Sequence, residues 1–138
     1  MISTGNGQAE PFTAYLLVRQ DAWSAGYFIF GNAGYLFEQK VTTPNVSISA
    51  TTHTANNSDL TLNTFMSVRY VGNGSSSSLT IGNGTPTTGD PGTASGSDIT
   101  LGLAFQPASF SIKDFVLQSG VGSDDDWTNM QAYHATIP

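Results

Sequence analysis

The stretch VGNGSSSSLTIGNGTPTTG, residues 71–89, decides whether the chain is one module or two. Its Gly and Ser content is typical of a flexible linker. However, Leu79 and Ile81 stand two residues apart, so both side chains point to one face of a strand. The Asn-Gly pairs supply the positive-φ positions that a tight hairpin turn needs. We therefore predict a hairpin over residues 68–82, followed by a loose loop over residues 85–97 where partner contacts are expected.

Apolar strands continue on both sides of this stretch. FMSVRYV (residues 65–71) precedes it and ITLGLAF (residues 99–105) follows it, so a domain boundary here would leave two incomplete cores. The chain has 138 residues, of which 38% are hydrophobic and 11% aromatic, enough for one folded domain. We predict a single domain over residues 1–138, with residues 1–10 as a flexible or truncated N-terminal segment.

Short strands separated by turn signals fill most of the remaining sequence. FTAYLLVR (12–19) alternates as a strand, and YFIF (27–30) and YLFEQKV (35–41) form a predicted hairpin around GNAG. VSISA (46–50) is a strand and TTHTANNSD (51–59) a polar loop. In FSIKDFVLQ (110–118), strict alternation places Ile112 and Asp114 on one face and Lys113 on the other.

One short segment near the C-terminus has the pattern of a helix. Ser123 is a suitable N-cap, and the three aspartates after it suit the positive end of the helix dipole. Trp127 is expected to pack this helix onto the sheets, whereas His134 is expected to be exposed. The whole pattern predicts an all-β fold, a two-sheet antiparallel β-sandwich or jelly roll with one C-terminal helix.

Three segments carry a resemblance to a known family: PFTAYLLV (11–18), LTLNTFMSVRYVGNGSSSSLTIGNG (60–84) and IKDFVLQSGVGSDDDWTNMQAYH (112–134). Their order resembles the laminin-G-like, concanavalin A-like jelly roll, with Phe65 where a Trp usually stands. Such domains usually begin with a further strand or two before the first segment. The resemblance implies a carbohydrate- or protein-binding module. Some members cleave glycans, and some are domains of phage tail fibres and other virion proteins.

Charge and composition exclude several classes of partner. The net charge is −6, and only four basic residues are present, scattered along the chain. Nucleic acid and anionic membrane surfaces are therefore not expected, because both require clustered cations. No apolar run approaches the roughly 20 residues of a membrane span. The chain has no cysteine, which excludes disulfides and thiolate chemistry. Such Cys-free, acidic, Ser/Thr/Asn/Gly-rich β domains are typical of extracellular and virion surfaces.

Catalytic and metal-binding patterns are weak in the sequence. Neither Glu10 nor Glu38 has an acidic residue two or five positions later, as a strand-borne glycosidase pair would need. No Gly-X-Ser-X-Gly elbow occurs. Helix capping explains the aspartate run at 124–126, and we predict no cofactor. Loop carboxylates at Asp59, Asp90 and Asp98 leave Ca²⁺ as an alternative that we do not favour.

Sugar-binding sites combine an aromatic face with amide, hydroxyl or guanidinium groups. Trp23 is the first candidate because it stands in a short polar loop, although such a residue can also cap a sheet edge. The candidate ligand-binding residues are Trp23, Tyr15, Arg19, Tyr27, Tyr35 and His53.

The sequence therefore predicts a non-catalytic recognition module that binds a glycan, on a virion or a secreted protein. Its expected partners are cell-surface or extracellular glycans or other virion subunits, with homo-oligomerisation left open. The alternatives are a structural or decoration virion protein that mediates assembly without binding sugar, and a glycan-cleaving enzyme.

Overall fold

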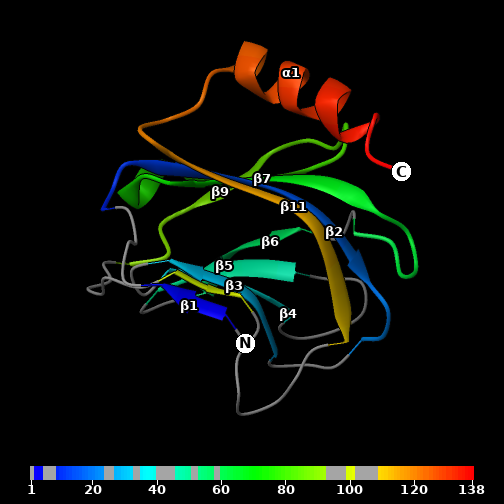
Figure 1. The fold of residues 1–138 in the computed structure, drawn as a ribbon. Helices are drawn as coiled ribbons and strands as arrows, with labels where there is room; N and C mark the ends of the chain where they lie inside the picture. Colours follow the sequence, from blue (N-terminus) through cyan, green and yellow to red (C-terminus); the bar gives the residue numbers. More distant parts are fainter. Residues whose placement is uncertain are drawn as a thin grey trace.

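We describe the protein from a computed structural model (Figure 1). The structure describes residues 2–4, 9–23, 27–32, 35–39, 46–50, 53–57, 60–92, 99–101 and 109–138, with the backbone alone at 2–4, 27–30, 32 and 53–57. Most of these residues lie in strands, and one helix follows the last strand. The structure confirms the prediction of an all-β fold with antiparallel sheets and one short C-terminal helix.

The strands form two antiparallel sheets that lie in two layers (Figure 1). The first sheet has the order β1-β10-β3-β4-β5-β6 and the second the order β11-β2-β7-β8-β9. The strands of the first sheet are β1 (Ile2–Thr4), β3 (Tyr27–Asn32), β4 (Tyr35–Gln39), β5 (Val46–Ser49), β6 (His53–Asn57) and β10 (Ile99–Leu101). Those of the second are β2 (Phe12–Gln20), β7 (Met66–Gly72), β8 (Ser77–Ile81), β9 (Thr87–Gly89) and β11 (Phe110–Ser119).

A hydrophobic core fills the space between the two sheets. Alternate residues of β2, among them Phe12 and Leu16, are fully buried in it and belong to one cluster with Phe37 of β4 and Ile48 of β5. This is the pattern expected of a strand that turns one face to the core. The odd-numbered residues of β2 point to the outer face of the second sheet, and Tyr15 is buried there as well. Both faces of β2 are therefore covered.

The hairpin predicted over residues 68–82 is confirmed, because β7 and β8 pair antiparallel with Tyr70 opposite Leu79. Its connection contains a short 3-10 helix, Gly74–Ser76, with Gly74 at φ +52°, rather than a two-residue Asn-Gly turn. The loop expected over residues 85–97 is wrong in part, because residues 87–89 form β9, which pairs with β8 at the edge of the sheet. Residues 93–98 of that loop lie outside the described part.

One prediction about the first sheet is confirmed, and two are corrected. The hairpin of β3 and β4 is confirmed. Residues 53–57, expected in a polar loop, instead form β6 and pair with β5, since backbone pairing needs no apolar side chains. The N-terminal segment expected to be flexible contributes β1, which pairs with β10.

A β-bulge in β11 changes which side chains face outward. Ile112 pairs with Val18, but Asp114 pairs with Leu17, so Lys113 is the extra residue of the bulge. Ile112 and Phe115 pack against the core, and Asp114 joins Lys113 on the outer face. The prediction that Asp114 shares a face with Ile112 is wrong, because the bulge shifts the alternation by one residue.

Helix α1 (Asp124–His134) lies on the outer side of the second sheet (Figure 1). It begins with a capping box, in which the Ser123 side chain accepts from the Asp126 amide and the Asp126 carboxylate accepts from the Ser123 amide. The predicted N-cap is confirmed. Among the described residues, no helix is long and apolar enough to span a membrane.

Candidate functional site

The N-terminal half of α1 is held on the sheet by an aromatic stack. The rings of Tyr15 and Trp127 lie nearly parallel, with centroids 6.3 Å apart. Trp127 is 8% exposed, as expected for a residue that packs the helix onto the sheet. Tyr15 is 1% exposed, and burial raises the pKa of its hydroxyl. The structure thus places Tyr15, predicted as a ligand-binding residue, beneath α1, which covers its ring.

Arg69 of β7 adds a polar contact at the same end of the helix. Its guanidinium donates to Asp124 Oδ1 at 3.0 Å and to the Ser123 carbonyl oxygen at 3.3 Å, and lies 5.8 Å from the centre of the Trp127 ring. Val68 and Tyr70 beside it are fully buried in the core, so Arg69 points to the outer face as the alternation predicts. These contacts fix the first turn of α1 on the sheet.

The C-terminal end of α1 is held by a chain of three polar groups. His134 Nδ1 lies 2.8 Å from Ser67 Oγ on β7, and His134 Nε2 lies 3.2 Å from Asp114 Oδ2 on β11. Burial lowers the pKa of His134, although its hydrogen bond to the Asp114 carboxylate opposes that shift. A neutral imidazole has one donor and one acceptor, and a carboxylate only accepts. Nε2–H therefore donates to Asp114, and the Ser67 hydroxyl donates to Nδ1.

The expectation that His134 is exposed is wrong, because this residue is only 3% exposed. The contact to Asp114 exists because the β11 bulge turns that carboxylate to the outer face. The three groups join α1 to β7 and β11, the strands on either side of β2.

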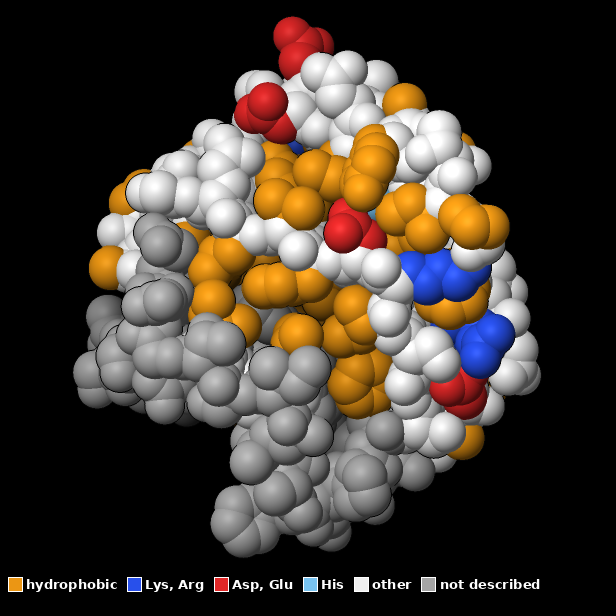
Figure 2. All heavy atoms as spheres, viewed as in Figure 1, with side chains coloured by type: hydrophobic (Ala, Val, Ile, Leu, Met, Phe, Trp, Pro, Cys, Tyr) orange, Lys and Arg blue, Asp and Glu red, His pale blue; other side chains and the backbone are white. Residues whose placement is uncertain are grey.

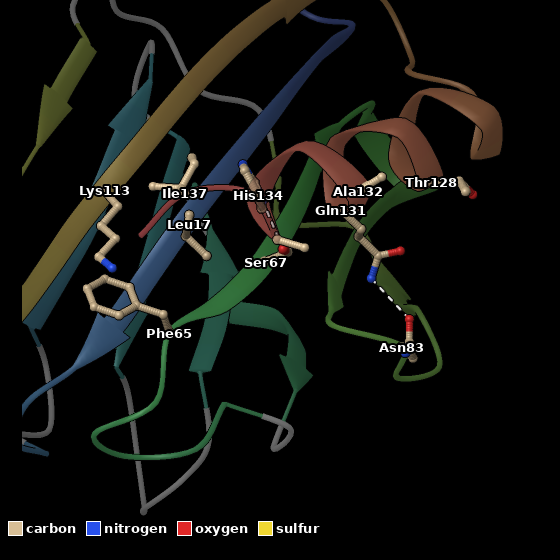
Figure 3. A pocket seen from close by; sticks show the side chains of 11 residues that line it. Leu17, Phe65, Ser67, Asn83, Lys113, Thr128, Gln131, Ala132, His134 and Ile137 are labelled. Carbon is tan, nitrogen blue, oxygen red and sulfur yellow. Dashed lines mark hydrogen bonds between the residues drawn. The ribbon is translucent and has the colours of Figure 1, made fainter.

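An open groove of about 540 Å³ lies between the C-terminal half of α1 and the outer face of the second sheet (Figure 3). We call it the α1 groove. Its walls are formed by polar and apolar side chains from β2, β7 and the residue before it, β11, α1, the β8–β9 connection and the chain after the helix. They are Leu17, Phe65, Ser67, Asn83, Lys113, Thr128, Gln131, Ala132, His134, Ala135 and Ile137.

One end of the α1 groove carries an aromatic ring with two cations close to it. Lys113 Nζ lies 4.3 Å and the Arg19 guanidinium carbon 4.9 Å from the centre of the Phe65 ring. Figure 2 shows two basic side chains close together on this face, next to hydrophobic ones. Arg19 forms an ion pair with Asp21 and donates to Ser111. The predicted ligand-binding residue Arg19 is thus on the surface beside the α1 groove, although it does not line it.

The other end of the α1 groove carries a pair of amides. Gln131 Nε2 donates to Asn83 Oδ1 at 3.1 Å and to the Gly82 carbonyl oxygen at 2.9 Å (Figure 3). This arrangement leaves the Asn83 amide nitrogen and the Gln131 amide oxygen without a hydrogen-bond partner among the described residues. The Asn83 amide nitrogen, which carries two N–H groups, and the Gln131 amide oxygen are therefore available to a ligand.

The remaining predicted ligand-binding residues do not meet in one place. Trp23 is half-buried and packs against the core, which is the edge-capping alternative for this residue. Tyr35 is a core residue, 3% exposed, with its ring 5.6 Å from that of Phe12. The structure thus places this predicted binding residue in the hydrophobic core between the sheets. Tyr27 and His53 lie in β3 and β6, and their side chains are outside the described part.

The acidic residues of the described chain form no metal centre. No group of three His, Cys, Asp or Glu side chains converges among the described residues. Glu38 is 2% exposed and accepts a hydrogen bond from Ser49 at 2.9 Å. Asp59 and Asp98, named for the Ca²⁺ alternative, lie outside the described residues, whereas Asp90 accepts from the Gly92 amide.

In comparisons with known proteins, no family model, no curated protein and no solved structure matches the chain.

Proposed function

We propose that the chain is a non-catalytic recognition module with a concanavalin A-like jelly-roll fold, and that it binds a glycan in the α1 groove. The observation that carries this proposal is the chemistry of the groove wall. Amide, hydroxyl and ammonium groups converge there from Asn83, Gln131, Ser67 and Lys113, beside the apolar surface of Phe65. Sugars offer alternating hydroxyls and apolar C–H faces, and sites that bind them combine these two kinds of group.

This proposal moves the binding site from Trp23 to α1. Trp23 is half-buried and packs against the core, whereas the amide side chains of Asn83 and Gln131 line the α1 groove. The surface of a virion or of a secreted protein remains the proposed location, on the basis of composition and of the resemblance given above. A decoration protein that assembles through this face without binding sugar is the alternative.

A glycan array with three proteins tests the proposal. We expect the wild type to bind, Asn83→Ala to lose at least about tenfold in affinity, and Trp23→Ala to bind as the wild type does once its fold is confirmed by circular dichroism. A loss confined to Trp23→Ala would refute the placement of the site. No binding by the wild type, together with self-association in sedimentation analysis, would favour the assembly alternative.

Hydrolysis is a second candidate function, because hydrogen bonds connect Ser67, His134 and Asp114 in series. The order of hydrogen bonds is that of a serine nucleophile, a base and a carboxylate. However, Ser67 lies inside a regular strand, and its carbonyl already accepts from the Gly82 amide at 2.8 Å. Stabilisation of an oxyanion would fall to side chains such as Asn83. We therefore favour a structural role for the three groups.

Covalent labelling distinguishes a structural role of Ser67, His134 and Asp114 from a catalytic one. A fluorophosphonate probe should leave Ser67 unmodified in intact-mass spectrometry if the groups only hold the helix. Labelling of the wild type that is absent in Ser67→Ala and slowed in Asp114→Asn would establish the hydrolase instead.

A further inference from the structure

We propose that the glycan bound in the α1 groove carries an acetamido group, as N-acetylated amino sugars do, and that Asn83 and Gln131 bind this group. The inference rests on the proposed glycan-binding function and names its ligand class. It follows from the hydrogen-bonding groups that the two amides leave free and from the side chains beside them.

The two amides present a donor and an acceptor on adjacent side chains. Gln131 Nε2 has two N–H groups and donates to two acceptors, Asn83 Oδ1 at 3.1 Å and the Gly82 carbonyl oxygen at 2.9 Å. Among the described residues this leaves the Gln131 amide oxygen and the Asn83 amide nitrogen for a ligand. Asn83 is exposed and Gln131 half-buried, and both line the groove, so a ligand can reach them. A secondary amide has one N–H and one C=O group and therefore matches this pair.

Methyl groups lie on the helix next to Gln131, and they fit the methyl group of an acetamide. Thr128 and Ala132 line the groove together with Gln131 (Figure 3). Thr128 stands three residues before Gln131 and four before Ala132, so it is a neighbour of both on the helix surface. The Thr128 hydroxyl donates to the Asp124 carbonyl oxygen at 2.9 Å, which leaves its methyl group to contact a ligand. Burial of the acetyl methyl against this surface would add to the affinity.

The groove wall beside the two amides offers no charge to a ligand. Among the described residues that line the groove, only Lys113 and His134 can carry one. Lys113 lies at the other end, against the ring of Phe65, and both ring nitrogens of the buried His134 are already hydrogen-bonded. A carboxylate or an ammonium group would be desolvated here without an opposite charge. A hydroxyl could use the same donor and acceptor, but it would leave the methyl groups of Thr128 and Ala132 uncovered.

The test is a titration of the 138-residue chain, by calorimetry, with pairs of oligosaccharides that differ only in one substituent, an acetamido group or a hydroxyl. We expect the wild type to bind at least one acetamido member at least about tenfold more tightly than its hydroxyl counterpart. Asn83→Asp should abolish this preference, because its carboxylate still accepts from Gln131 but cannot donate to the acetyl oxygen. Asn129→Asp is the matched control. It makes the same change at an exposed position of α1 outside the groove and should retain the preference.

A second variant tests the methyl contact and does not disturb the amide pair. Thr128→Ser keeps the hydroxyl that donates to the Asp124 carbonyl oxygen and removes only the methyl group. It should weaken binding of the acetamido sugar by about fourfold, which is the effect of one buried methyl group. Circular dichroism and thermal melts establish that each variant is folded.

The outcomes separate this inference from the proposal on which it rests. Equal binding of the acetamido and hydroxyl members, or a preference that survives in folded Asn83→Asp, overturns the acetamido site and leaves glycan binding standing. Should Asn83→Asp fail to fold, unchanged binding of the acetamido sugar by Thr128→Ser overturns the site. Binding of N-acetylalanine methylamide with the affinity of the acetamido sugar also overturns it, since a sugar is then not what is recognised. Failure of the wild type to bind any member of the panel overturns both proposals.

Discussion

Gly122 tests whether α1 is docked as the structure shows. A Cβ at this position would lie 1.9 Å from the Tyr15 hydroxyl oxygen and 3.0 Å from Tyr15 Cζ. The glycine is buried, and its amide donates to Thr13 Oγ1 at 2.8 Å, so the backbone has no room to retreat. Gly122→Ala must therefore push the Tyr15 ring away from Trp127 or lift the start of the helix.

The expected cost is that of overpacking a filled site, about 1–3 kcal/mol of unfolding free energy. At roughly 4 °C per kcal/mol for a chain of this size, the melting temperature should fall by about 4–12 °C. Tyr15→Phe alone should change stability by less than about 0.5 kcal/mol, because the hydroxyl is buried with no hydrogen-bond partner among the described residues. In the double variant the worst contact disappears, and we expect at least half of the lost stability to return.

Urea denaturation followed by Trp fluorescence measures all these variants. Gly120→Ala is the matched control, because Gly120 has φ +87° but no heavy atom within 4 Å of its Cβ position. Its cost is backbone strain alone, about 1–2 kcal/mol, which Tyr15→Phe cannot relieve. Equal behaviour of the two glycine variants in the Tyr15→Phe background would refute the docking contact.

Three further predictions concern stability. Because the pKa of His134 is lowered in the folded protein, the unfolded chain takes up the His134 proton at a higher pH than the folded chain does. The unfolding free energy should therefore be undiminished above about pH 7.5 and should decrease below about pH 6.5. Urea titrations at several pH values measure this slope, which should be absent from His134→Gln. Gly72→Ala should lower the melting temperature more than the other glycine variants do, because its Cβ would lie 2.2 Å from the Phe12 ring in the core. A fall in melting temperature as small as that of Gly120→Ala would contradict this packing. Ser123→Ala should cost about 1 kcal/mol through loss of the capping box, with helix content by circular dichroism as the check, and an unchanged stability would argue against the cap.

The local patterns of the chain were sufficient to predict most strands. Alternation in β2 and β8, the turn residues between β3 and β4, and the Ser123 cap each depend on neighbours in sequence, and the structure confirms them. The strand β6 was missed because its residues, HTANN, carry no apolar alternation. A strand of this kind forms through backbone pairing with β5, which no local pattern encodes.

The candidate site was missed for a related reason. Ser67 and His134 are 67 residues apart and meet only because α1 folds back onto the sheet. One signal was nevertheless present in the sequence. In β11, the apolar residues Phe110, Ile112, Phe115 and Leu117 change from a spacing of two to three and back, which is what a single-residue bulge produces. Reading that spacing would have placed Lys113 and Asp114 together on the outer face.

The helix and the α1 groove depend on one another in this fold. Gln131 and His134 attach α1 to the sheet and also line the groove, so the groove exists only while the helix is docked. A ligand that reaches from Lys113 on β11 to Gln131 on α1 would join the same two parts of the molecule. By linkage, such a ligand stabilises the docked state in proportion to the logarithm of its concentration above its dissociation constant. Ligand binding should therefore slow hydrogen exchange of the α1 amides more than that of the distant β4 and β5, whereas a ligand bound near Trp23 has no reason to favour the helix.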